Sequence, residues 1–123
     1  NEVKKITGET AKSEAIFYIS KSLIDQGKLE ESISFSKLIS DFAKKSEIDR
    51  IIVKELLILR KVSSAIEIAS KMVIKSGIVY APYRTDAFIE ISKYYIDNGE
   101  DKLAIISTSL FFFKYLIITG TKS

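Results

Sequence analysis

A block near the start of the chain recurs 72 residues later. Residues 15–33 and residues 87–105 are identical at eight of 19 aligned positions, and Gly27 and Gly99 are one of the matched pairs. Self-similarity at a fixed spacing is typical of repeat proteins, in which each unit buries its apolar face against the next unit. The sequence therefore predicts a fold assembled from repeated units.

Two landmarks locate a third, degenerate copy between these blocks. The first landmark is a run of basic, hydroxyl, acidic and apolar residues, found at residues 12–15, 45–48 and 84–87. The second is a small residue followed by Ile, which comes 19 residues after each hydroxyl residue, at Ser32, Ala65 and Ala104. Because both landmarks keep one offset in three places, we expect a single domain over residues 1–123, with copies at about 12–43, 45–76 and 84–118.

Each copy is predicted to be a pair of helices. Apolar residues recur at helical spacing, as in Ile16, Ile19 and Leu23. The hydroxyl residue of the first landmark is expected to cap the first helix of each copy. The predicted helices are residues 13–25, 29–42, 47–59, 62–75, 85–97 and 101–117. Gly27 and Gly99 mark the turn inside a pair, and because Arg60 replaces Gly in the middle copy, we expect a tighter turn or less separated helices there.

A helix pair of about 34 residues resembles the tetratricopeptide-repeat (TPR) class. A turn Gly followed five residues later by a small residue, as in Gly27 with Ser32, matches that motif, and so does the small residue Ser20 within the first helix. The middle copy departs from it with Val53 and Arg60, and the expected Trp and final Pro are missing. The resemblance implies an all-α domain of three antiparallel helix pairs, stacked as a short right-handed α–α superhelix that binds a protein or peptide.

In the TPR class, the first helix of each pair lines a concave groove. Matching the copies puts Lys21, Lys54 and Lys93 at one helix position, so stacked first helices would carry a ladder of ammonium groups. The neighbouring positions complete the candidate peptide-binding set with Phe17, Tyr18, Arg50, Ile89 and Glu90. Arginine can hold a carboxylate through two parallel hydrogen bonds. The groove is therefore expected to bind an acidic peptide segment, against the alternative that these lysines are simply solvated.

The last predicted helix is apolar around nearly its whole circumference. Residues 110–118 include three consecutive Phe residues and a single charge, Lys114. A helix that is apolar on all sides favours burial on all sides, but the apolar run is too short to span a membrane. We expect an interface at Phe112, Phe113 and Leu116. The alternative function is therefore a structural or self-associating helical domain without a peptide groove, and the alternative for this helix is packing on the chain's own core.

Composition excludes several kinds of site. The chain has no Cys and no His, so disulfides, thiol nucleophiles, imidazole bases and the usual zinc ligands are absent. No phosphate-binding glycine loop is present, and we expect neither an enzyme nor a cofactor or metal. The net charge of +3 is modest, so a nucleic-acid partner is disfavoured. We expect a cytoplasmic location, and because the chain begins at Asn1, we expect it to be a piece of a longer protein.

Overall fold

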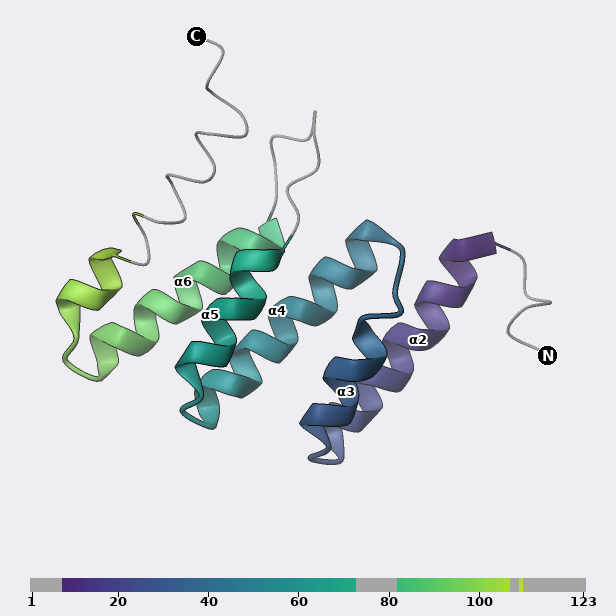
Figure 1. The fold of residues 1–123 in the computed structure, drawn as a ribbon, viewed down its shortest axis with the longest axis horizontal. Helices are drawn as coiled ribbons and strands as arrows, with labels where there is room; N and C mark the ends of the chain where they lie inside the picture. Colours follow the sequence, from purple (N-terminus) through teal and green to yellow (C-terminus); the bar gives the residue numbers. More distant parts are fainter. Residues whose placement is uncertain (1–7, 73–81, 107–108, 110–123) are drawn as a thin grey trace, which may run out of the picture. The chain divides into compact units, whose positions relative to one another are not determined.

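The fold is all-α, as the sequence predicts. A computed structural model describes residues 8–72, 82–106 and 109, and the regular structure in these residues is entirely helical (Figure 1). The complete helices are α2 (Gly8–Asp25), α3 (Leu29–Ser36), α4 (Phe42–Ile58), α5 (Val62–Lys71) and α6 (Pro82–Asp97). Residues 101–106 are also helical. The helices pack in adjacent pairs, each joined by a short turn.

The turn inside each pair has the same backbone geometry. Gly27, Arg60 and Gly99 all have positive φ angles, of 79°, 62° and 76°. The amide of each residue donates to the carbonyl oxygen three residues earlier, at 2.9, 3.0 and 3.0 Å. The following amide donates to the carbonyl oxygen five residues before it, at 2.8, 2.8 and 2.7 Å. This pair of hydrogen bonds is the Schellman arrangement, which ends a helix with a residue in the left-handed region.

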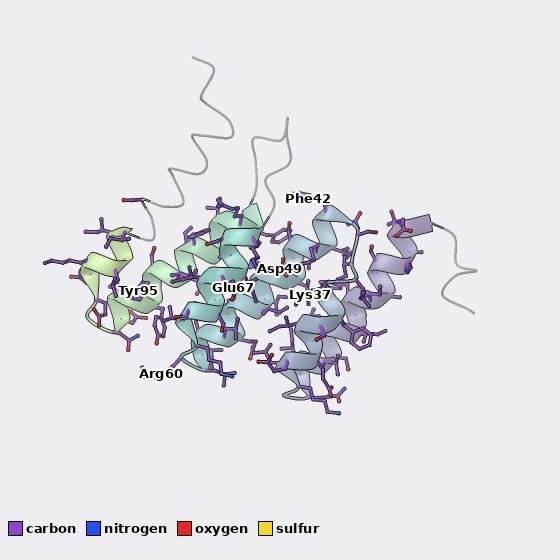
Figure 2. The ribbon with its side chains drawn as sticks, viewed as in Figure 1. Lys37, Phe42, Asp49, Arg60, Glu67 and Tyr95 are labelled. Carbon is purple, nitrogen blue, oxygen red and sulfur yellow. The ribbon has the colours of Figure 1, made fainter. Side chains whose placement is uncertain are left out.

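The prediction of a tighter middle turn or less separated helices is therefore wrong, since three residues separate the helices both in this pair and in the first. Arg60 adopts the conformation that glycine adopts in the other two copies, although a side chain in the left-handed region costs about 1–2 kcal/mol. Its guanidinium Nη1 donates to Asn98 Oδ1 at 3.1 Å, so the middle turn is bonded to the turn of the next pair (Arg60 is labelled in Figure 2). The repeat thus survives in the backbone where the sequence has lost its glycine.

Helix starts differ from the predicted ones. The first helices begin at Gly8, Phe42 and Pro82, so the landmark hydroxyl residues lie inside them and the capping prediction is wrong. Asp41 caps α4 instead, because its Oδ2 accepts from the backbone amide of Lys44 at 3.0 Å. Pro82 suits the first position of α6, where no amide partner is needed. The second helices α3 and α5 are shorter than predicted and end at Ser36 and Lys71.

Ser13 closes the loop between the first two pairs. Its side chain is buried, and its Oγ accepts from the backbone amides of Ser40 and Asp41 at 3.2 and 3.0 Å. These part-buried amides immediately precede α4, so the hydroxyl fixes the loop at the start of that helix. Ser13 therefore acts across 27 residues of sequence rather than at the start of its own helix.

The second landmark, a small residue, is confirmed as a packing position. Ser32, Ala65 and Ala104 are 0%, 0% and 5% exposed. A small side chain lets the second helix approach the first closely, and in the first pair the Ser32 Oγ also donates to the Ser20 carbonyl oxygen at 2.8 Å. This close approach explains why larger residues do not occupy the position.

The chain divides into two compact units, Asn1–Ile52 and Val53–Ser123, with the boundary inside α4. In the first unit α2 packs on α3, and its core includes Ile16, Phe17, Ile39 and Ile48. In the second unit α5 packs on α6, and the buried apolar side chains are Val53, Leu56, Leu57, Ala65, Ala69, Met72, Ala87, Phe88, Ile91 and Ala104.

Two predictions concern the apolar segment at residues 110–118. Phe112, Phe113 and Leu116 lie outside the described residues, so the proposed interface there stays a prediction. Within the residues that the structure describes, none of the helices combines the length and the apolar character needed to cross a bilayer.

Candidate functional site

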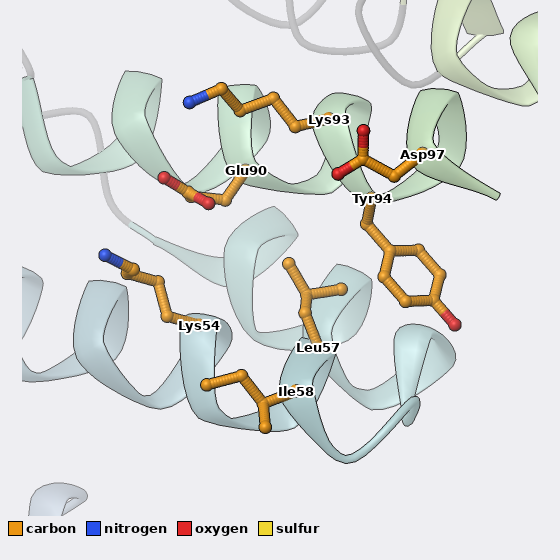
Figure 3. Close-up of a pocket in the computed structure, with 7 residues that line it drawn as sticks. All are labelled: Lys54, Leu57, Ile58, Glu90, Lys93, Tyr94 and Asp97. Carbon is orange, nitrogen blue, oxygen red and sulfur yellow. The ribbon is translucent and has the colours of Figure 1, made fainter.

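A pocket of about 390 Å³ opens in the second unit (Figure 3). The residues that line it come from two first helices, α4 and α6. They are Lys54, Leu57, Ile58, Glu90, Lys93, Tyr94 and Asp97. The pocket therefore lies between the first helices of two consecutive copies.

Helical periodicity explains why these residues meet. On α6, Glu90, Lys93, Tyr94 and Asp97 follow the spacing i, i+3, i+4 and i+7, which places them on one face. The fully buried Ile91 lies on the adjoining face, about 100° around the helix from Glu90. On α4, residues 54, 57 and 58 form the matching stripe beside the buried core. On α6 the core face and the pocket face thus lie side by side, whereas on α4 the buried Leu57 belongs to both.

The charged groups of the pocket are two ammonium groups and two carboxylates. Within the described part of the chain no ion pair joins Lys54, Glu90, Lys93 or Asp97. Figure 3 shows the ammonium groups of both lysines projecting toward the end where the Glu90 carboxylate lies, while Asp97 lies at the other end with Tyr94. The four charges are therefore separated into two ends of the pocket.

Apolar side chains lie between these ends and beside Asp97. The Ile58 side chain is 69% exposed, whereas Leu57 is only 8% exposed and continues into the core. The Tyr94 ring meets the neighbouring Tyr95 ring edge to face, with centroids 5.9 Å apart. A well-packed ring beside exposed aliphatic carbon gives the pocket an apolar patch that a ligand side chain can cover.

Three predicted site residues meet in this pocket, namely Lys54, Glu90 and Lys93. Ile89 is 48% exposed on α6 but does not line the pocket. The other predicted residues belong to the first unit, and they are Phe17, Tyr18, Lys21 and Arg50. The three-lysine ladder therefore stays a prediction.

Sequence reasoning missed four lining residues. Leu57 and Ile58 follow Lys54 by three and four positions, and Tyr94 and Asp97 follow Glu90 by four and seven. Helical spacing from Lys54 and Glu90 could have identified these four residues, because positions three, four and seven apart share a helix face.

The predicted aromatic residues of the first unit have different surroundings. Phe17 is 2% exposed and belongs to the core, so a partner would contact Tyr18, which is 55% exposed. The two rings meet edge to face with centroids 5.3 Å apart. The Lys44 Nζ lies 4.7 Å from the Phe17 ring centroid, within the range of a cation–π contact. Phe17 thus positions its neighbours instead of offering a free anchor.

Two ionisable groups outside the pocket have shifted pKa values. Burial raises the pKa of the Asp49 carboxyl, and the ion pair with Lys45 at 2.6 Å opposes that rise in part (Asp49 is labelled in Figure 2). Burial lowers the pKa of the Arg84 guanidinium, whose carbon lies 4.9 Å from the Phe88 ring centroid. Neither group lines the pocket. No cluster of three potential metal-ligating residues occurs among the residues that the structure describes.

Comparisons with protein-family models, with curated proteins and with solved structures found no match for this chain. Inferences about function therefore rest on the structure itself. The structure shows an all-α protein whose helices pack in adjacent pairs and whose second unit has a mixed-charge pocket on a first-helix face.

Proposed function

We propose that this protein is a protein–protein interaction module, with TPR-like helix pairs, that binds a peptide segment of a partner. The observation that carries the proposal is the pocket between α4 and α6, which collects Lys54, Glu90 and Lys93 on facing first helices. The proposal includes a right-handed stacking of the pairs, in which Lys21 takes the place in the first copy that Lys54 and Lys93 take in the others.

The pocket offers a peptide two kinds of contact. An apolar side chain can cover Ile58 and the Tyr94 ring, and burial of apolar surface contributes about 25 cal/mol per Å². A carboxylate can approach the ammonium groups of Lys54 and Lys93, where each exposed charge pair adds about 0.2–1 kcal/mol. The apolar contact therefore supplies most of the binding free energy, and the charges set orientation and specificity.

The test is selection of binders from a random 12-residue peptide library displayed on phage, followed by calorimetric titration of the enriched peptides. We expect enriched peptides to lose affinity at least about tenfold for the Lys54→Glu, Lys93→Glu double variant, because it reverses the cationic end of the pocket. The affinity should also fall with added salt, since exposed charges are screened.

The matched control is the Lys37→Glu, Lys102→Glu double variant. Both lysines are exposed and lie outside the pocket, and the control changes the net charge by the same amount. Equal affinity of both double variants for every enriched peptide would contradict the proposed site, and failure to enrich any peptide would contradict the proposed function.

A further inference from the structure

The two ends of the pocket differ in charge, and this difference restricts the ligand. We propose, on the basis of the proposed function, that the pocket selects a mixed-charge peptide segment rather than an acidic run. The segment carries an acidic residue at the lysine end, an apolar residue in the middle and a basic residue at the Asp97 end.

The lysine end has a single excess positive charge. The ammonium groups of Lys54 and Lys93 project toward the same end as the Glu90 carboxylate (Figure 3). Two cations beside one anion attract one further carboxylate, but a second carboxylate from the ligand would meet Glu90 without a free cation to balance it. This end therefore accepts one acidic residue.

The other end is acidic. Asp97 lines it, and no ion pair is made by this carboxylate within the described residues. The guanidinium of Arg60 contacts Asn98, the residue that follows Asp97, and its Nη1 donates to Asn98 Oδ1 at 3.1 Å. An ammonium or guanidinium group of a ligand would gain a charge-assisted contact with Asp97, whereas a carboxylate would be repelled.

The spacing of these groups sets the length of the recognised segment. Glu90 and Asp97 are seven residues apart on α6, which corresponds to about 10 Å along a helix axis. Three residues of an extended chain, or seven residues of a helix, cover the same length. The apolar residue between the charged ones then lies over Ile58, with the Tyr94 ring on its Asp97 side.

The experiment compares peptide libraries selected on the wild-type chain and on its Asp97→Lys variant. Wild type should enrich peptides with an acidic, an apolar and a basic residue at the spacing given above. Replacing the basic residue by Glu in the best peptide should weaken binding about tenfold, because the new carboxylate meets Asp97. The Asp97→Lys variant should reverse this preference and bind the doubly acidic peptide more tightly.

Glu14→Lys is the matched control, since Glu14 is exposed on α2, outside the pocket, and the substitution changes the net charge equally. This variant should keep the wild-type preference. Enrichment of polyacidic peptides that depend on Lys54 and Lys93 but not on Asp97 would overturn the mixed-charge inference and leave the proposed function standing. Failure to enrich any peptide would overturn both.

Discussion

Arg60 shows how one residue keeps a repeated backbone geometry without the glycine that normally supports it. Its φ of 62° lies in the same left-handed region as the 79° of Gly27 and the 76° of Gly99, and its turn makes the same two backbone hydrogen bonds. The left-handed conformation of Arg60 therefore costs free energy, but the turn keeps both of its backbone hydrogen bonds. Nothing near Gly27 or Gly99 would clash with an added Cβ, so backbone conformation alone explains the preference for glycine there.

Arg60→Gly is expected to raise the free energy of unfolding by about 1 kcal/mol, because it removes the left-handed strain. Gly27→Ala and Gly99→Ala should lower it by a similar amount. Chemical denaturation measures all three changes. Arg60→Ala is the control, because it removes the bond to Asn98 but keeps the strain, and it should leave stability within about 0.5 kcal/mol of wild type. Equal stabilisation by Gly and Ala at this position would contradict a backbone origin.

Asp49 makes a contribution to stability that decreases as the pH rises, opposite to that of a carboxylate whose pKa is lowered by folding. Burial raises the pKa of its carboxyl in the folded state, so the folded protein binds this proton more tightly than the unfolded chain does. The contribution of Asp49 to the free energy of unfolding is therefore largest below its ordinary pKa of 3.8, and it falls as the pH rises through the folded-state value. At neutral pH the buried carboxylate is a net cost that the ion pair with Lys45 offsets in part.

Asp49→Asn is expected to flatten the dependence of stability on pH above 3.8 and to equal or exceed the wild type in stability at pH 7. Urea denaturation between pH 3 and pH 7 measures this difference. Lys45→Met is the informative comparison, because loss of the ammonium group raises the Asp49 pKa further and steepens the fall. If the free energy of unfolding of the wild type increased relative to that of Asp49→Asn as the pH rises, this account would be contradicted.

At the scale of the helix, small residues set how closely two helices of a pair approach. Ala65 and Ala69 on α5 are both 0% exposed, and Ser32 on α3 is equally buried. Ser32 and Ala65 could be recognised from the sequence because they recur, with Ala104, at a fixed offset, and the turns of the first and third pairs could be recognised by their glycines. The starts of the first helices could not, because the contact that fixes the role of Ser13 joins it to amides 27 and 28 residues away.

Ala65→Leu is expected to lower the free energy of unfolding by about 1–3 kcal/mol, because the larger side chain has no space between α5 and its partner helix. The measurement is equilibrium denaturation followed by circular dichroism at 222 nm, the ordinary signal of helix content. Ser64→Leu places the same side chain at the adjacent exposed position and should change stability by less than about 0.5 kcal/mol. If both substitutions have equal effects, helix propensity rather than packing sets the stability here.

At the scale of the whole molecule, the sequence predicted the fold class, the helix pairs and part of the pocket. Lys54, Glu90 and Lys93 were reached by matching copies, which works because equivalent positions of repeated helices face the same way. Phe17 was misread as an accessible anchor because its burial depends on side chains such as Lys44 that approach from another helix. Repetition thus predicts which face of its helix a residue occupies. Whether that side chain is buried depends on contacts with other helices.

Phe112→Asp together with Leu116→Asp is expected to give a protein of lower assembly state, as measured by light scattering coupled to size-exclusion chromatography. The reason lies in the sequence, since a helix that is apolar on every side gains most from burial against a second surface. Thr119→Asp with Thr121→Asp, which adds two negative charges beyond the apolar run, should leave the assembly state unchanged. A monomeric wild type would contradict the predicted interface.

The identical hydrogen bonding of the three turns has a consequence for how such a protein can lengthen. An extra helix pair introduced by duplication would bring its own internal turn, which forms with either Gly or Arg at the left-handed position. A duplicated pair would therefore need no new turn chemistry, and only its surfaces toward the neighbouring pairs and toward a ligand would have to adapt.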